Sequence, residues 1–225
     1  MAAATRSVRF AVDDDRSVSG LLDAPPSPTA CLVFAHGAGA AMGHPFMTAI
    51  AEGLSASGIA VLRFNFPYME AGSRRPDRPP VAMATVRAAT AEAATLVPDV
   101  PLFAGGKSFG GRMTSQAQAE TPLPGVRGLI FFGFPLHASG KPSVERADHL
   151  SSIELPMLFL QGTRDSLADQ GLIRSVCEGL GARATLHIVE DGDHSFHVRK
   201  ASGRDDVAVR DEIVAAVVSW IATID

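Results

Sequence analysis

The hydrophobic positions of the chain gather into short continuous runs that end at glycine or polar residues. Strands covered on both faces show such runs, because neither face alternates toward water. The pattern therefore predicts buried strands at 31–35, 59–64, 101–104, 126–132, 156–160 and 184–189.

The N-terminal region has a different pattern. Two further runs, 7–12 and 18–22, flank the acidic sequence Asp13-Asp14-Asp15. Two strand-like runs joined by a turn predict a β-hairpin. We therefore expect a hairpin before the first buried strand.

Helical patterns fill most of the gaps between the runs. Phe46, Ile50 and Leu54 recur every four residues in one gap, and the next is rich in alanine, which favours helix. Alternating strands and helices imply right-handed crossovers and a mostly parallel central sheet with helices on both faces. We predict a three-layer α/β fold in one domain, 1–225, with helices at 45–57, 81–97, 108–119, 167–180 and 205–221.

Composition narrows the classes of protein that fit this fold. Hydrophobic residues make up 46% of the 225 positions and charged residues 20%, which argues against a disordered or fibrous protein. A formal net charge of −4 argues against binding to nucleic acid or to an anionic membrane. Two cysteines give no disulfide scaffold and no metal-ligand spacing. With no signal-peptide core and no long apolar run, we expect a cytoplasmic protein.

Glycine and polar residues concentrate directly after the predicted strands. In open parallel sheets, ligands bind beyond the carboxyl ends of the strands. The sequence therefore places a candidate site among the segments 36–39, 65–68, 105–108, 133–135, 161–165 and 191–194.

The pattern G-x-S-x-G begins in segment 105–108 and reads Gly106-Lys107-Ser108-Phe109-Gly110. It lies between a strand and a helix, where a nucleophile elbow lies in hydrolases. We predict Ser108 as the nucleophile and the backbone N–H of Phe109 as a donor to an oxyanion. The alternative is that Ser108 only caps the following helix.

A serine hydroxyl needs a base that takes its proton. His194 follows the last predicted strand and is the predicted base, with His197 as the competitor and a plain surface histidine as the alternative. Asp165 follows the preceding strand and is predicted to orient the base. Asp169 competes for this role, and Asp165 could instead cap the next helix. The order serine, aspartate, histidine matches a hydrolase triad.

A second oxyanion donor is expected in the loop after the first buried strand. Its sequence is His36-Gly37-Ala38-Gly39-Ala40, whose small residues let backbone approach a substrate. We predict the N–H of Ala38 as the donor, with Gly39 as the alternative. His36 is expected to brace this loop by hydrogen bonds.

Together these motifs resemble the α/β-hydrolase superfamily, in particular small hydrolases of the dienelactone-hydrolase-like type. The similar segments are 36–40, 63–68, 105–113 and 161–165, and the resemblance extends from Cys31 to the C-terminal helix. It implies the α/β-hydrolase fold, with the triad and oxyanion roles assigned above. Dienelactone hydrolases use a cysteine nucleophile, whereas this chain has a serine.

The residues around the site give expectations about the pocket. Segment 133–155 stands where many relatives carry a cap domain, so we expect no cap, a short covering segment with one helix, and an open site. Lys107 is expected to pair with a carboxylate. The candidates for substrate binding are Gly39, Phe66, Tyr68 and His137.

The sequence thus predicts a serine hydrolase that cleaves a small-molecule ester, thioester or lactone through an acyl-enzyme. No metal and no organic cofactor are expected. The alternatives are a peptidase or acyltransferase on the same triad, or a non-catalytic binding protein with this fold. The sequence neither indicates nor excludes a homo-oligomer.

Overall fold

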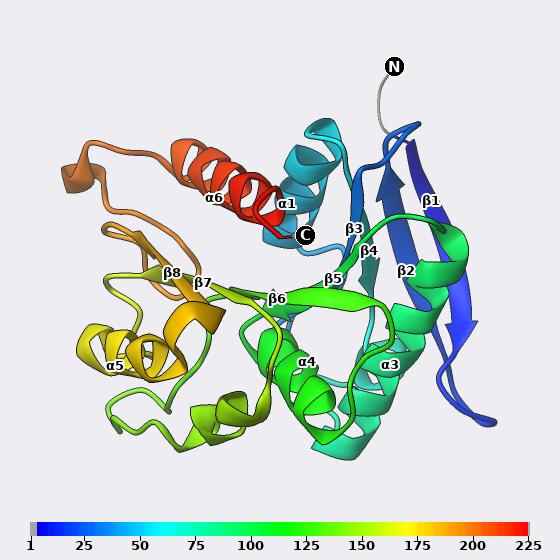
Figure 1. Cartoon of the computed structure of the whole chain (residues 1–225), viewed down its shortest axis with the longest axis horizontal. Coiled ribbons are helices and arrows are strands. Elements are labelled where there is room, and N and C mark those ends of the chain that lie inside the picture. The colour runs from blue at the N-terminus through cyan, green and yellow to red at the C-terminus, as the bar shows by residue number, and fades with distance from the viewer. Residues whose placement is uncertain (1–3, 225) are drawn as a thin grey trace.

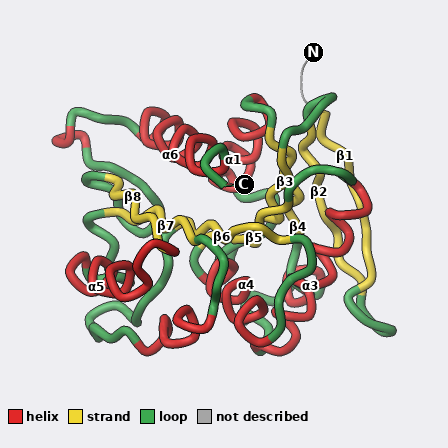
Figure 2. Tube along the Cα trace, in the orientation of Figure 1, coloured by secondary structure: helices red, strands yellow, loops and turns green. Residues whose placement is uncertain are grey.

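The computed structural model describes residues 4–224 and contains an eight-stranded sheet (Figure 1). Figure 2 shows the strands crossing the middle of the molecule between helices. The strands are β1 (Ala4–Ala11), β2 (Ser17–Ala24), β3 (Ala30–Ala35), β4 (Ile59–Phe64), β5 (Leu102–Lys107), β6 (Val126–Phe132), β7 (Met157–Gly162) and β8 (Ala184–Val189).

The strand order is β1-β2-β4-β3-β5-β6-β7-β8. β1 pairs antiparallel with β2, and β2 pairs antiparallel with β4, whereas β3 to β8 run parallel. The carboxyl ends of the parallel strands therefore share one edge of the sheet, which is where the chemistry-bearing loops emerge.

Helices cover both faces of the sheet. In Figure 1, α1 and α6 lie on one face, and α3, α4 and α5 lie on the other. Their bounds are α1 (Pro45–Ala56), α3 (Pro79–Leu96), α4 (Phe109–Glu120), α5 (Gln170–Leu180) and α6 (Asp206–Ile221). Shorter helical turns are α2 (Pro67–Glu70), η1 (Glu145–Ser152), η2 (Gly181–Arg183) and η3 (Lys200–Ser202).

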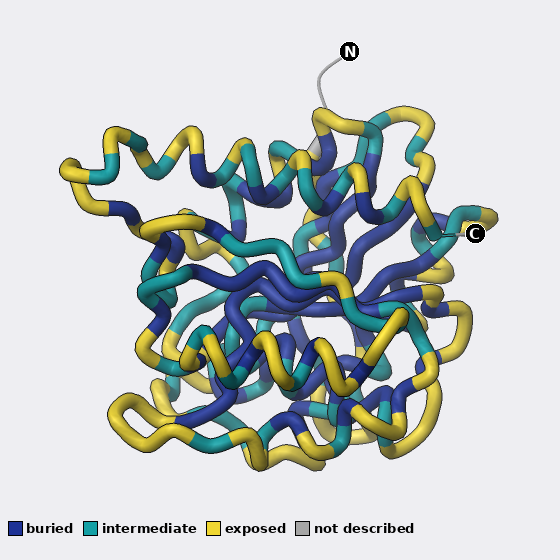
Figure 3. The backbone as a smooth tube through the Cα atoms, turned by 60° about the vertical axis from the view of Figure 1, so that its left-hand side comes forward, coloured by how far each residue is buried: buried dark blue, intermediate teal, exposed yellow. Residues whose placement is uncertain are grey.

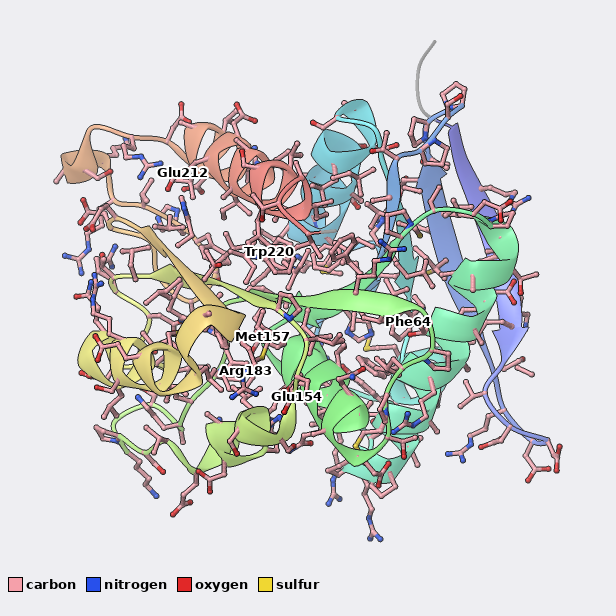
Figure 4. All side chains as sticks on the ribbon, viewed as in Figure 1. Phe64, Glu154, Met157, Arg183, Glu212 and Trp220 are labelled. Carbon is pink, nitrogen blue, oxygen red and sulfur yellow. The ribbon has the colours of Figure 1, made fainter. Side chains whose placement is uncertain are left out.

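Two apolar clusters, one on each face, hold the layers together. One joins the sheet to α3, α4 and α5, and the other joins it to α1 and α6. Trp220 of α6 belongs to the second cluster, where its ring lies 5.9 Å from that of Phe103 (Figure 4). Figure 3 shows the central strands as the most buried part of the backbone.

The predicted α/β-hydrolase fold is confirmed, and the hairpin and all six parallel strands form close to the expected bounds. The last strand departs from one expectation. β8 was expected to be covered on both faces, but most of its residues are half-buried. Its position at the edge of the sheet leaves one side without a neighbouring strand.

Segment 133–155, which was expected to cover the site, packs much of its apolar surface into the fold. Its apolar residues Leu136, Ala147, Leu150 and Ile153 are buried in the cluster beneath the sheet. The helical turn η1 packs against α4 and α5. These contacts anchor the segment on the fold, which has no cap domain within residues 4–224.

No helix in the described part of the chain combines the length and apolar character needed to cross a membrane.

Candidate active site

Ser108 lies in a tight turn between β5 and α4. Its φ of 50° falls in the left-handed region, which is unusual for a residue other than glycine. The residue occupies the N-cap position, but its side chain makes no capping hydrogen bond. Instead, Ser108 Oγ lies 2.8 Å from Nε2 of His194. The alternative of a simple helix cap therefore does not describe this serine.

Close packing of backbone explains why glycine flanks the serine on both sides. A Cβ placed on Gly110 would lie 2.5 Å from the carbonyl oxygen of Ala35 and 2.6 Å from that of His36. A Cβ on Gly106 would also collide with the Ala35 carbonyl. Helix α4 can thus approach β3 only without side chains at these positions.

The structure brings His194 and Asp165 together from the loops after β8 and β7. The distance between His194 Nδ1 and Asp165 Oδ2 is 2.7 Å, and the Asp165 side chain is 1% exposed. Two further donors fix the carboxylate: the backbone N–H of Leu167 at 2.8 Å and the side-chain amide of Gln161 at 2.5 Å. With the proton on Nδ1 facing the carboxylate, Nε2 is left to accept from the Ser108 hydroxyl.

The competing residues have other contacts. Asp169 is the N-cap of α5, and its side chain accepts from the backbone N–H groups of Gly171 and Leu172. His197 is exposed, and its Nδ1 lies 2.9 Å from Asp206 Oδ2, a contact that raises the pKa of the imidazole. Neither residue shares a hydrogen bond with Ser108 or with His194, whose ring partners are Ser108 and Asp165.

The loop after β3 lies against the serine turn. A Cβ placed on Gly37 would lie 3.8 Å from Ser108 Cβ, and Ala38 lines the cavity in front of the serine. On the other side, Phe109 supplies one of the backbone N–H groups that the first turn of a helix leaves without an internal partner. Gly39 is exposed, with a φ of 71°, and does not line the cavity.

His36 braces this loop, as predicted. Its Nδ1 lies 2.8 Å from the carbonyl oxygen of Gly37, and its Nε2 accepts from the backbone N–H of Phe66 at 3.1 Å. Because Nδ1 donates to a carbonyl while Nε2 accepts from an N–H, the imidazole of His36 is in its neutral form. Burial accordingly lowers the pKa of His36 to about 4.

Arg63 is a site-supporting residue that sequence reasoning missed. It forms a buried ion pair with Asp23 at 2.8 Å and donates to the carbonyl oxygen of Met42 at 2.9 Å. The side chain of Asn65 accepts from the backbone N–H of Met42 at 3.0 Å. Both contacts anchor the far end of the loop that begins at Gly37. The sequence did offer one signal for this role, because Arg63 is a charged residue inside the apolar run 59–64.

A cavity of about 320 Å³ opens in front of Ser108. Sequence reasoning did not identify its apolar wall, which consists of Phe46 and Met47 at the start of α1 and Leu167 after β7. The remaining lining residues are Gly37, Ala38, Ala40, His44, Lys107, Ser108, His194 and Ser195. A larger groove of about 590 Å³, between β8 and α6, contains none of these residues.

All four residues predicted to bind substrate lie outside this cavity: Gly39, described above, and Phe66, Tyr68 and His137. Phe66 is fully buried, and its ring packs against His36 and Phe109. Tyr68 is also buried, with its hydroxyl 3.5 Å from the carbonyl oxygen of Gly37. Nε2 of His137 accepts from the backbone N–H of Asp169 at 2.9 Å. These side chains support the loops of the site from behind.

Lys107 differs from its expected role. Among the described residues, no carboxylate lies within ion-pair distance of its ammonium, which donates instead to the backbone carbonyl of His194. The expected ion pair is therefore wrong. The described part of the chain also contains no group of three or more histidine, cysteine or carboxylate side chains that could hold a metal ion.

Solved structures with the same fold are numerous. A dienelactone hydrolase from Anabaena variabilis matches with a TM-score of 0.77 at 19% identity, covering 100% of this chain and 99% of that one. A serine hydrolase without a lid from Xanthomonas campestris matches with a TM-score of 0.73 at 22% identity, over 97% and 95%. The esterase domain of a Rhodothermus marinus protein matches with a TM-score of 0.75 at 17% identity, covering 98% of this chain and 99% of that one. At such identities these similarities establish the fold.

A family model described as an alpha/beta hydrolase domain matches residues 28–222. The matched range begins just before β3 and ends within the C-terminal turn after α6. It therefore contains Ser108, Asp165, His194 and every residue that lines the cavity.

Proposed function

The chain belongs to the alpha/beta hydrolase domain family, and we propose that it is a serine hydrolase acting on a carboxylic ester, thioester or lactone. The observation that carries this proposal is the continuous hydrogen-bonded series from Ser108 through His194 to Asp165, in which Ser108 and His194 line the cavity. A nucleophile, its base and an orienting carboxylate are the groups that acyl transfer requires.

In the acylation half of the reaction, Ser108 Oγ attacks the carbonyl carbon of the substrate. His194 Nε2 takes the hydroxyl proton, and Asp165 stabilises the imidazolium that forms. The backbone N–H groups of Phe109 and Ala38 donate to the oxyanion of the tetrahedral intermediate. Collapse of this intermediate breaks the ester bond, and His194 returns the proton to the leaving group.

The second half regenerates the enzyme. His194 takes a proton from a water molecule, which attacks the acyl-enzyme carbonyl and forms a second tetrahedral intermediate. When this intermediate collapses, the bond to Ser108 Oγ breaks and the serine recovers its proton from His194. The products are the carboxylic acid and the unchanged enzyme.

The cavity supports a substrate with a short apolar acyl group. Its volume of about 320 Å³ is at the lower end of the range for small-molecule sites. Phe46, Met47 and Leu167 provide an apolar wall beside the nucleophile. No cap domain closes over it within residues 4–224, so the leaving group can extend toward solvent.

The proposal is tested by Ser108→Ala, assayed with a fluorophosphonate probe and with acyl esters of graded chain length. We expect the variant to lose probe labelling and to lose turnover by at least about 10³-fold, with the wild type preferring short acyl chains. Ser151→Ala, which changes an exposed serine on η1, is the matched control and should retain both activities. Retained turnover in Ser108→Ala would contradict the proposal.

Product analysis separates this reaction from the alternatives on the same triad. Hydrolysis yields the free acid in the presence of added alcohols, whereas an acyltransferase would yield the new ester. Cleavage of peptide substrates at rates comparable with esters would indicate a peptidase. A binding protein without activity would not react with the fluorophosphonate at all.

A further inference from the structure

Lys107 links the nucleophile turn to the loop that carries the base. It immediately precedes Ser108, and its ammonium donates to the backbone carbonyl of His194. The Nζ atom lies 5.2 Å from the ring centre of Phe196 and 6.0 Å from that of Phe46. These two rings stack on each other at 5.6 Å, so the cation, the aromatic pair and the base loop form one packed group.

The loop that Lys107 holds is strained. Phe196, two residues after His194, has a φ of 63°, and Asp191 has a φ of 59°. An aromatic residue in the left-handed region is a conformational outlier that persists only when its surroundings enforce it. The Phe46 ring and the Lys107 ammonium are part of those surroundings. The imidazole of His194 therefore depends on contacts from outside its own loop.

The charged form of Lys107 is the form that suits these contacts. Asp165 and Asp193 attract the ammonium from the loops after β7 and β8, without reaching ion-pair distance. The other polar residues that line the same cavity as Lys107 are Ser108, His194, Ser195 and His44. Burial lowers the pKa of Lys107 to about 8, with the two carboxylates opposing that shift.

The backbone beside the triad leaves space for this ammonium. Gly133, at the end of β6, has a φ of 73°, and a Cβ there would lie 3.0 Å from Lys107 Nζ. The same Cβ would lie 3.5 Å from His194 Nδ1 and 3.6 Å from Asp165 Oδ2. The cation thus occupies a position next to the hydrogen bond between base and carboxylate.

We propose that Lys107 is a positioning residue whose ammonium holds the His194 loop so that the imidazole stays within reach of Ser108. The inference rests on the proposed hydrolase function. A hydrogen bond from a charged donor is roughly twice as strong as a neutral one. Loss of the proton from Lys107 weakens the restraint on a strained loop, and the serine and the base then lose their alignment.

The proposal predicts that kcat/KM decreases as the pH rises. Below pH 8 the ammonium is present and the loop is held; as pH rises through about 8, the holding form is lost and kcat/KM falls several-fold. Loss of the Lys107 proton does not destabilise the folded protein in this pH range, so unfolding caused by this group does not explain the fall in kcat/KM. Because folding lowers the pKa of Lys107 from 10.5, the unfolded chain binds more protons between pH 8 and 10.5, and this group's contribution to stability increases there.

The test compares the pH profiles of the wild type, Lys107→Arg and Lys107→Met, using ester turnover and the rate of fluorophosphonate labelling. Arginine keeps the charge at all these pH values and stacks on aromatic rings. We expect Lys107→Arg to stay active at neutral pH and to lose the decline near pH 8. Lys107→Met should fall about 100-fold at pH 7, as expected for a misplaced catalytic group, with no decline near pH 8.

Lys141→Met, which changes an exposed lysine in the loop before η1, is the matched control and should keep the wild-type profile. Thermal denaturation of each variant across the pH range shows whether it remains folded; if Lys107→Met does not fold, the profile of Lys107→Arg decides. A decline near pH 8 that persists in Lys107→Arg, or wild-type kinetics in folded Lys107→Met, overturns the inference. An inactive wild type would instead contradict the proposed hydrolase function.

Discussion

The two halves of the candidate site are built by different means. The nucleophile turn after β5 is fixed by backbone packing, because a side chain at Gly106 or Gly110 would collide with the carbonyl of Ala35. The loop after β8 is fixed by side chains, since His194 depends on the carboxylate of Asp165 and on the ammonium of Lys107. One half therefore relies on the absence of side chains and the other on polar groups.

This difference predicts two kinds of failure. A side chain added to the nucleophile turn has to displace backbone of β3, so its effect appears first in stability. Removal of a polar group that contacts His194 or its carboxylate partner leaves the sheet and helices in place, so its effect appears first in turnover. The three predictions below test that division.

The largest effect is expected from Asp165→Asn. The amide cannot stabilise the imidazolium, and it favours the wrong tautomer of His194, so kcat should fall by about 10⁴-fold. Asp169→Asn makes the same chemical change in the same loop and is the control, because asparagine also caps helices well. Steady-state kinetics with a short acyl ester measures both. Equal losses in the two variants would refute the assignment of Asp165.

An intermediate effect is expected from Gly110→Ala. The added methyl group would meet the backbone oxygens of Ala35 and His36 at 2.5 and 2.6 Å, and backbone cannot rotate away as a side chain can. We expect the free energy of unfolding to fall by about 3 kcal/mol, measured by urea denaturation. Gly179→Ala in α5 is the control, since no atom lies near that position, and it should stabilise by up to about 1 kcal/mol. A Gly110→Ala variant as stable as the wild type would contradict the conclusion that close backbone packing fixes the nucleophile turn.

Local sequence patterns were sufficient for the elements and for the position of Ser108. The runs 59–64, 126–132 and 184–189 form strands with those bounds, because a run of apolar residues and its turn signals are local features. The predicted resemblance to the superfamily is confirmed by the family match. The edge position of β8 was not predictable in this way, since its run resembles those of interior strands and only the strand order exposes it.

The cavity wall and the contact of Lys107 also depend on the tertiary arrangement and could not be predicted from local sequence patterns. Phe46 and Met47 follow Pro45 at the start of α1, where periodicity does not tell which side chain faces a neighbouring loop. Phe66 and Tyr68 were placed near the right strand end, but their rings turn into the core behind His36. The partner of Lys107 is a backbone carbonyl, which leaves no signature in the sequence.

The smallest effect is expected from Asp169→Ala, which tests whether the two aspartates after β7 divide structural and chemical roles. Asp169 accepts from two backbone N–H groups at the start of α5, so its loss should lower the free energy of unfolding by about 1 kcal/mol. The Asp165 carboxylate keeps its contacts with Gln161 and Leu167, so kcat at 25 °C should stay close to the wild-type value. Urea denaturation and ester turnover on the same sample separate the two quantities. A loss of turnover comparable with that of Asp165→Asn, in a variant that remains folded, would show that the two aspartates do not divide these roles.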